Sequence, residues 1–249
     1  MADNRSFEFT EEAKVFEKIV ESRRSIRLFE KEPVPEAVIR HSLDMALLAP
    51  NSSNLQCWEF YWVRTPAKKA ELVKACLSQA AASTAAELIV CVARTQTWKR
   101  VCKDMLFQMD EHRKKGARIS KAAQHYYEKL VPIVYTQGPL GLFGLLKRIG
   151  FFIVGLRKPI GREPASCHHM DLWAVKSTAL GCENLMLALR AHGYDSCPME
   201  GMDSRRVRKL LKLPGDAIVT MVLAVGKRRP EGVTIPRIRE ERSLHVKEV

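Results

Sequence analysis

The residue run 217–225, which reads AIVTMVLAV, is the strongest strand signal in the chain. It is apolar, rich in β-branched residues and followed directly by Gly226. Shorter strand patterns stand at 58–63 and 88–93, and helical patterns separate the strands, including a long one at 171–192 before Gly193. Because helices outnumber scattered strands and no internal repeat is present, the sequence predicts an α+β fold, with helices around a small sheet.

The remaining segments give weaker patterns. A helix is predicted to begin at Glu11 after the capping residue Thr10, and a second one to lie between Pro35 and Pro50. Further helices are predicted at 66–77, 98–131 and 204–211. We expect residues 138–165 to be irregular, Cys197-Pro198 to form a turn, and the tail after residue 226 to be extended and basic.

The chain has 249 residues and a formal net charge of +13, which needs an explanation. Nucleic acid, an anionic membrane surface or a phosphate-bearing cofactor could each provide one. The chain also has seven cysteines, without CxxC spacing, and its first residues lack a signal-peptide pattern. We therefore expect reduced thiols in a cytoplasmic protein.

The segment 139–160 is apolar but contains four basic residues, namely Lys147, Arg148, Arg157 and Lys158. Its longer uncharged runs, 139–146 and 149–156, have eight residues each, far fewer than the roughly 20 that a membrane-spanning helix needs. We expect this segment to touch a membrane surface or to cover an apolar site, but not to cross a bilayer.

Three short motifs contain candidate ligand-binding residues. Arg23-Arg24-Ser25-Ile26-Arg27 offers forked donors suited to phosphate, or it is a solvated basic turn at a helix end. The loop 51–58, NSSNLQCW, suits a neutral heterocycle or a sugar hydroxyl, or is a capping loop. The segment 197–203, CPMEGMD, allows close backbone approach to a ligand at Gly201, or is a turn.

Several familiar sites are excluded by spacing. Gly138, Gly141 and Gly144 follow GxxGxxG rather than GxGxxG and lack a surrounding βαβ unit, so no Rossmann site is predicted. The chain also lacks a P-loop and a GxSxG elbow. Because Cys167-His168-His169 has no second ligand pair at suitable spacing, we predict no metal site.

The order of the motifs is more specific than any one of them. An RRSIR segment is followed by a PxSxNxQxW loop, a long helix ending in AxGYxSCPMEGMD, a strand ending in glycine and a basic tail. In this order the chain resembles the nitroreductase family of FMN-dependent oxidoreductases, over residues 12–95 and 168–249. The resemblance implies one domain over 1–249, with a small mixed β-sheet flanked by helices, an intertwined homodimer, and an insert at about 98–165 that acts as a lid.

The resemblance also implies the residues of a flavin site. Those expected to hold the phosphate and ribityl chain of FMN are Arg23, Arg24, Ser25 and Arg27, with Arg237 and Arg239 from the tail. The loop expected to meet the flavin from the partner subunit consists of Asn51, Ser52, Ser53 and Asn54. Glu200 and Gly201 are expected beside the isoalloxazine ring, and Gln79 is a further candidate contact.

The implied activity is a ping-pong reduction of a flat, electron-poor small molecule, such as a nitroaromatic or quinone, by NADH or NADPH. No side chain is expected to act as a catalytic acid, because the flavin performs the chemistry. Reductive dehalogenation or flavin fragmentation on the same scaffold stays an alternative. From another class, a basic nucleic-acid-binding module is the rival, although the chain lacks a nucleic-acid motif and its arginines cluster in two segments that match a flavin site.

Overall fold

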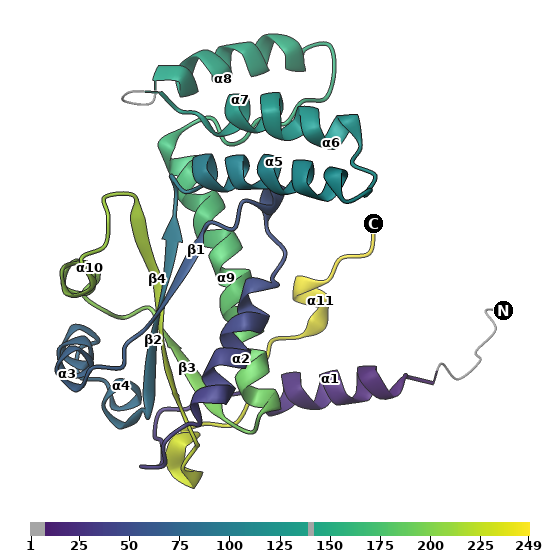
Figure 1. The fold of residues 1–249 in the computed structure, drawn as a ribbon. Coiled ribbons are helices and arrows are strands. Elements are labelled where there is room, and N and C mark those ends of the chain that lie inside the picture. Colours follow the sequence, from purple (N-terminus) through teal and green to yellow (C-terminus); the bar gives the residue numbers. More distant parts are fainter. Residues whose placement is uncertain (1–7, 139–141) are drawn as a thin grey trace.

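The computed structural model describes residues 8–138 and 142–249, and a four-stranded sheet lies at its centre (Figure 1). The strands follow the spatial order β1-β2-β4-β3. Their bounds are β1 (Trp58–Trp62), β2 (Glu87–Arg94), β3 (Asp195–Met199) and β4 (Ala217–Gly226). This arrangement confirms the predicted α+β class and the predicted strands at 58–63, 88–93 and 217–225.

The strand directions correct the expectation of a mixed sheet. All three neighbouring pairs among the described strands are antiparallel, and the parallel component is an isolated bridge between Ser25 and Ser196. In that bridge the Ile26 N–H donates to the carbonyl of Ser196, 3.1 Å away. The next bond of a parallel ladder would come from the N–H of residue 198, which is a proline and has none. The ladder therefore stops after one bridge.

Helices cover both faces of the sheet (Figure 1). On one face lie α2 (Glu36–Leu47) and α9 (Cys167–Ala191), and on the other α3 (Pro66–Ala75), α4 (Ala80–Thr84) and α10 (Ser204–Leu211). Successive side chains of a strand point to opposite faces. In β2, Ile89 and Cys91 therefore pack toward α2 and α9, whereas Val90 and Val92 pack toward the other layer. This two-sided burial explains why the central strands are apolar throughout.

Two predicted irregular segments are regular in the structure. The expected turn at Cys197-Pro198 is part of β3, an edge strand, where proline is tolerated because one side of the strand needs no ladder bond. Part of the region expected to be irregular, 138–165, forms α8 (Leu142–Gly155). Residues 139–141, which include Gly141, lie outside the described part of the chain.

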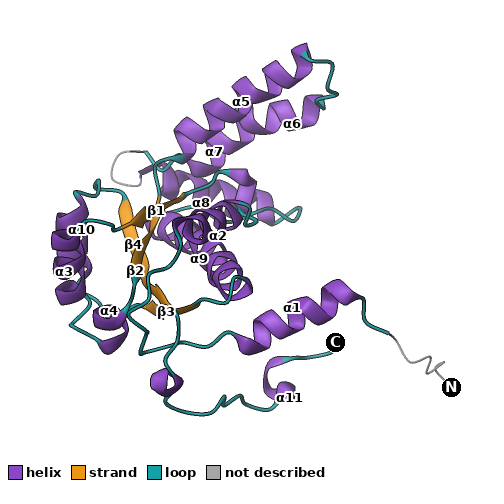
Figure 2. Cartoon of the chain, turned by 60° about the horizontal axis from the view of Figure 1, so that its bottom comes forward, coloured by secondary structure: helices purple, strands orange, loops and turns teal. Residues whose placement is uncertain are grey.

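The insert forms a helical lobe that projects from the sheet (Figures 1 and 2). Besides α8 it contains α5 (Trp98–Lys114), α6 (Lys121–His125), the π-helical segment η2 (Tyr126–Leu130) and α7 (Val131–Tyr135). The predicted helical segment 98–131 is thus interrupted by a loop, whose Gly116 has a φ of 86°. A left-handed backbone of this kind suits glycine and ends α5.

The first and last helices lie on one side of the molecule (Figure 1). Helix α1 (Glu11–Ser22) projects away from the sheet. Helix α11 (Arg242–His245) lies beside α1 in both views (Figures 1 and 2). The tail was predicted to be extended throughout, but besides α11 it contains a 3₁₀ turn, η4 (Pro230–Gly232).

All seven cysteines are free, and only Cys167 is exposed. Burial raises the pKa of the Cys57 and Cys76 thiols to about 11, so both stay protonated at neutral pH. None of the helices within 8–138 and 142–249 has the length and apolar character that a membrane crossing requires.

Candidate functional site

Two basic segments that are far apart in the sequence form one pocket. Residues 23–27 follow α1, residues 235–239 belong to the tail, and together they enclose a cavity of about 230 Å³. Its polar lining consists of Arg23, Arg24, Ser25, Arg27, Arg237 and Arg239. We call this cavity the basic pocket. The structure thus brings together all six residues that the family resemblance assigned to a phosphate.

Backbone contacts fix the floor of the basic pocket. The fully buried Ile26 anchors the first segment to the core, and the Arg27 N–H donates to the carbonyl of Gly232, 3.0 Å away. A side chain at position 232 would place its Cβ only 2.7 Å from the carbonyl oxygen of Leu28, so glycine is required for this close approach. Main-chain packing therefore holds the first arginine segment against Gly232, three residues before the second segment begins.

The guanidinium groups of the pocket contact carbonyl oxygens rather than carboxylates. Arg24 donates to the carbonyl of Ile235 at 2.6 Å, and Arg237 donates to those of Glu21 and Arg23 at 2.7 and 2.8 Å. The lining contains no Asp or Glu, and the nearest recorded carboxylate contact joins Arg23 Nε to Glu183 at 3.9 Å. Five like charges with only this one, more distant carboxylate beside them repel one another, so the pocket favours an anion.

A buried ion-pair network lies next to the basic pocket, at the end of α1. The Asp195 side chain is only 1% exposed and accepts hydrogen bonds from Arg190 at 2.8 Å and from Arg228 Nε at 2.7 Å. The same arginines donate to the hydroxyl and the carbonyl of Ser22, at 3.0 and 2.9 Å. This network fixes the end of α1, from which Arg23 follows, and the bond to Asp195 raises the pKa of Arg228.

We expect the substitution Asp195→Asn to lower the free energy of unfolding by about 2 kcal/mol, because charge-assisted bonds to a buried carboxylate would be lost. The matched variant Asp44→Asn, at an exposed position that forms no ion pair within the described part of the chain, should change it by less than about 0.5 kcal/mol. Urea unfolding of both variants measures the difference, and equal midpoints would contradict this role of Asp195.

A second group of predicted residues meets at the end of β3. Glu200 and Gly201 follow this strand directly, and the Gln79 amide donates to the carbonyl of Gly201 at 2.6 Å. Gln79 is held in turn by the carbonyl of Cys76, 3.1 Å away. The structure therefore places the three predicted residues at one position.

Strand β3 connects this group to the basic pocket. Ser196, near its beginning, bridges to Ser25, and Glu200 follows its end. At about 3.3 Å per residue, the five residues of the strand span about 16 Å. Burial raises the pKa of Cys197 in β3. The positive charge of Arg27 partly offsets this rise, because Arg27 lies near the strand. Strand β3 therefore sets the spacing between the arginines and the group at Glu200 and Gly201.

The loop 51–54 contacts the helical insert. The Ser52 hydroxyl is 3.1 Å from the Tyr135 hydroxyl, and the Ser53 hydroxyl is 2.5 and 2.9 Å from those of Tyr126 and Tyr135. Asn51 accepts from the Gln56 N–H at 2.8 Å, and Asn54 contacts Met105. The polar side chains of the loop are thus largely occupied by contacts with the insert and with the loop itself.

The tyrosines that hold this loop were not anticipated from the sequence. The Tyr127 hydroxyl also donates a hydrogen bond to the carbonyl of Ser53, 3.0 Å away. Residues of both η2 and α7 therefore hold the loop in place. Burial raises the pKa of Tyr135, which keeps its hydroxyl protonated and able to donate. The charged helical pattern around these residues contains no signal that could have identified a contact more than 70 positions away.

The segments next to the loop 51–54 and next to the basic pocket contact different turns of α9. Next to the loop, the Cys57 thiol contacts the carbonyl of Ala174, whereas Ser22, next to the pocket, contacts Arg190. Ala174 and Arg190 are separated by about 24 Å along the helix axis, at 1.5 Å per residue, and Glu183, which Arg23 of the pocket contacts, lies about 14 Å from Ala174. Among the described residues, no hydrogen bond or ion pair joins the loop to the other predicted site residues.

A cavity of about 300 Å³ lies beside the loop, lined by Ser52, Tyr135, Trp173 and Ser177. The indole nitrogen of Trp173 is buried and has no hydrogen-bond partner among the described residues. His169, which also lines this cavity, accepts a bond from the Ala165 N–H at 3.2 Å, whereas its neighbours Cys167 and His168 are exposed.

Comparison with known proteins gives a consistent result. The model of the nitroreductase family matches residues 20–227. A protein of Thermus thermophilus named NADH dehydrogenase is 30% identical over 220 residues, which cover 88% of this chain and 90% of the relative. Two solved structures share the fold. A nitroreductase-like protein from Streptococcus mutans has a TM-score of 0.70 at 21% identity and covers 95% of this chain and 99% of its own.

The second solved structure is a protein from Exiguobacterium sibiricum, assigned as a nitroreductase and determined in complex with FMN. Its TM-score is 0.68 at 23% identity, and the match covers 94% of this chain and 97% of that one. The family match includes the Arg23–Arg27 segment, the loop 51–54 and the end of β3. On the extent of this match, the chain belongs to the nitroreductase family.

Proposed function

We propose that this protein is an FMN-dependent oxidoreductase that uses NADH or NADPH to reduce a flat, electron-poor small molecule. The observation that supports this best is the basic pocket, in which five arginines and Ser25 from two distant segments converge without an acidic residue in the lining. The names of the relatives, one an NADH dehydrogenase and one a protein bound to FMN, point to the same chemistry.

The residues present fit FMN by the chemistry of their donors. Guanidinium groups bind phosphate through paired N–H bonds, and the Ser25 hydroxyl adds a further donor. In the proposed complex Arg23, Arg24, Ser25, Arg27, Arg237 and Arg239 hold the phosphate end, while Gln79, Glu200 and Gly201 lie beside the ring. FMN supplies two-electron redox chemistry when bound. The chain's own residues orient the cofactor and balance its charge.

We propose that the enzyme is a homodimer in which loop 51–54 completes the flavin site of the partner copy. The separation along α9 supports this, because among the described residues no hydrogen bond or ion pair joins the loop to the basic pocket of its own chain. Helix α1 supports it too, since Val15 and Phe16 are each 58% exposed and the helix has no buried residue. An apolar helix face of this kind needs a covering surface, which a second copy would provide.

We further propose that the insert, 98–165, covers the acceptor and determines which acceptors are reduced. Its tyrosines hold the loop 51–54, and Tyr135 also lines the cavity beside Ser52. Replacing residues 139–160 by a short Gly-Ser linker should change the ratio of turnover between small and bulky acceptors by about tenfold, while FMN content stays the same. Loss of FMN with unchanged ratios would contradict this role.

The proposed function predicts that the protein purifies with about one FMN per chain and binds FAD poorly. The physical reason is that the basic pocket suits a terminal monophosphate, and the sequence lacks a Rossmann loop for a second nucleotide half. Flavin released by heating is separated against FMN and FAD standards, and reduction of the bound flavin by NADH and by NADPH is followed by stopped flow. Recovery of FAD, or a colourless protein that binds DNA in a salt-sensitive manner, would overturn the proposal.

A further inference from the structure

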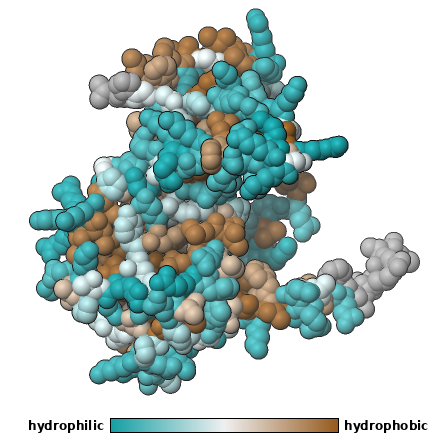
Figure 3. All heavy atoms as spheres, viewed as in Figure 1, coloured by the Kyte–Doolittle hydropathy of each residue, from teal (hydrophilic) through white to brown (hydrophobic). Residues whose placement is uncertain are grey.

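Helix α8 exposes a large apolar surface that the proposed flavin site does not use. Eight large side chains on and directly after this helix are between 52% and 71% exposed. They are Leu142, Phe143, Leu145, Leu146, Ile149, Phe152, Ile153 and Leu156. Figure 3 shows them as a hydrophobic layer at the top of the molecule, over α8. Apolar patches of this extent on a folded protein mark an interaction surface.

The attachment of α8 to the rest of the protein fixes which side faces outward. Gly144 is buried, and a Cβ at this position would lie 2.7 Å from the carbonyl oxygen of Ala165. One turn later, Lys147 Nζ donates to the carbonyl of Val134 at 2.7 Å and also to that of Thr136. Burial lowers the pKa of Lys147. These contacts occupy one narrow stripe of the helix, so the apolar side chains elsewhere on it cannot turn inward.

The charges on α8 and in the seven residues after it are all of one sign, and the first acidic residue, Glu163, lines a cavity with Arg148 and Arg162. Residues 142–162 contain five basic residues and no acidic one. Lys147 is used for docking, whereas the other four are exposed and have no ion pair among the described residues. They are Arg148, Arg157, Lys158 and Arg162. An apolar face bordered by exposed cations complements a bilayer with anionic headgroups.

We propose that α8 lies in the plane of a lipid bilayer that contains anionic lipids, with Ile149, Phe152 and Ile153 among the acyl chains and Arg157 and Lys158 among the headgroups. A helix of 14 residues is about 21 Å long, too short to cross the hydrocarbon core of about 30 Å. A second copy of this chain is a poorer occupant. A symmetric contact would bring two equally basic surfaces together, in a protein whose net charge is already +13.

Co-flotation with vesicles tests this inference on the full-length, FMN-loaded protein. We expect it to float with vesicles of phosphatidylcholine mixed with phosphatidylglycerol, and to bind at least tenfold more weakly to pure phosphatidylcholine. The double substitution Ile149→Ser with Phe152→Ser should reduce binding at least tenfold. The control Phe107→Ser, which removes a 67% exposed aromatic side chain from α5, should leave binding unchanged.

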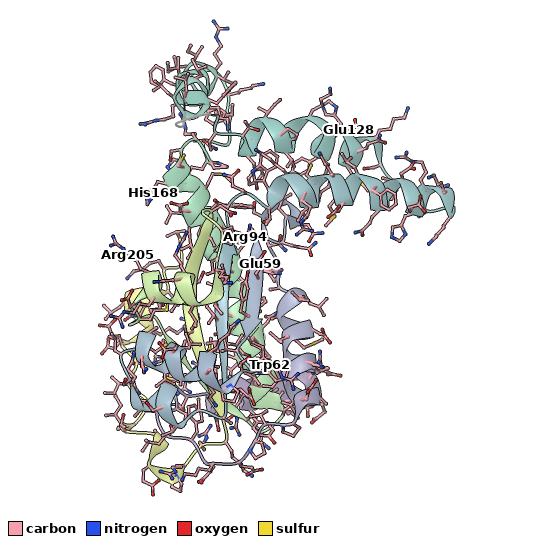
Figure 4. The ribbon with its side chains drawn as sticks, turned by 60° about the vertical axis from the view of Figure 1, so that its left-hand side comes forward. Glu59, Trp62, Arg94, Glu128, His168 and Arg205 are labelled. Carbon is pink, nitrogen blue, oxygen red and sulfur yellow. The ribbon has the colours of Figure 1, made fainter. Side chains whose placement is uncertain are left out.

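The contribution of charge has its own matched pair of variants. Arg157→Gln with Lys158→Gln should weaken binding to the anionic vesicles at least fivefold. Arg205→Gln with Lys209→Gln removes the same charge from exposed positions on α10, which packs on the other side of the sheet, where Figure 4 labels Arg205. This control should bind like the unmodified protein. An equal loss in both pairs would show that net charge alone drives binding, and would overturn the inference.

A conservative variant tests the position of α8 without disturbing the fold. With Phe152→Trp, vesicles of brominated phosphatidylcholine and phosphatidylglycerol should quench the added indole fluorescence, since bromine in the acyl chains quenches only at short range. Absence of this extra quenching, or absence of flotation, would overturn the inference. So would a change in sedimentation of the Ile149→Ser, Phe152→Ser protein without vesicles, because that would identify a second copy as the occupant. Bound FMN, measured in parallel, reports separately on the proposed function.

Discussion

Replacing both Arg23 and Arg27 by alanine should abolish retention of FMN while leaving the fold intact. Each charge-assisted bond to a phosphate contributes roughly 1.5–3 kcal/mol, so one substitution costs about ten- to hundredfold in affinity and two cost about a thousandfold. Arg27 is exposed and Arg23 contacts a carboxylate only at 3.9 Å, so their loss removes little packing. Titration of apoprotein with FMN measures the affinity, and far-ultraviolet circular dichroism reports the fold.

Two controls separate phosphate recognition from general charge. Arg118→Ala with Lys121→Ala removes the same charge from exposed positions of the insert and should bind FMN like the unmodified protein. Arg27→Lys keeps the charge but loses the planar fork of N–H donors. Its affinity for FMN should therefore lie between that of the unmodified protein and that of Arg27→Ala. If the double alanine variant kept its full affinity, Arg23–Arg27 would be a solvated basic turn and the proposed phosphate site would be wrong.

Removing the tail, residues 236–249, should eliminate FMN retention and also weaken the proposed dimer. The tail contributes two of the five arginines, and Arg237 ties it to the end of α1 through the carbonyls of Glu21 and Arg23. It also contains Leu244, which is 60% exposed on α11, a helix that lies beside α1 (Figures 1 and 2). Truncation therefore removes pocket and proposed interface together.

The double substitution Arg237→Ala with Arg239→Ala distinguishes these effects, because it removes charge and keeps the length of the tail. We expect it to lose FMN but to sediment like the unmodified protein, whereas the truncated protein should dissociate at concentrations at which the unmodified protein is dimeric. Flavin absorbance and sedimentation velocity on both proteins provide the comparison. A truncated protein that stays yellow and dimeric would refute both parts of the prediction.

The sequence by itself determined the elements whose pattern is local. The apolar run at 217–225 required a buried strand, and the periodic residues before Gly193 required a long helix, so β4 and α9 lie where they were predicted. The end of α10 at Leu211 also followed from the sequence pattern. The order of the polar motifs indicated the family as well, because it reflects the order in which the fold presents them.

Tertiary structure decided the features that depend on contacts between distant residues. Cys197-Pro198 reads as a turn, yet β3 forms because β4 supplies an edge on which proline is tolerated. Helix α8 contains three glycines and has a weak local preference for helix, but Lys147 fixes it to the carbonyls at the end of α7. The tyrosines that hold loop 51–54 and the convergence of residues 23–27 with 235–239 have no local signal. Such contacts span more than 70 and more than 200 positions, and only packing in three dimensions selects them.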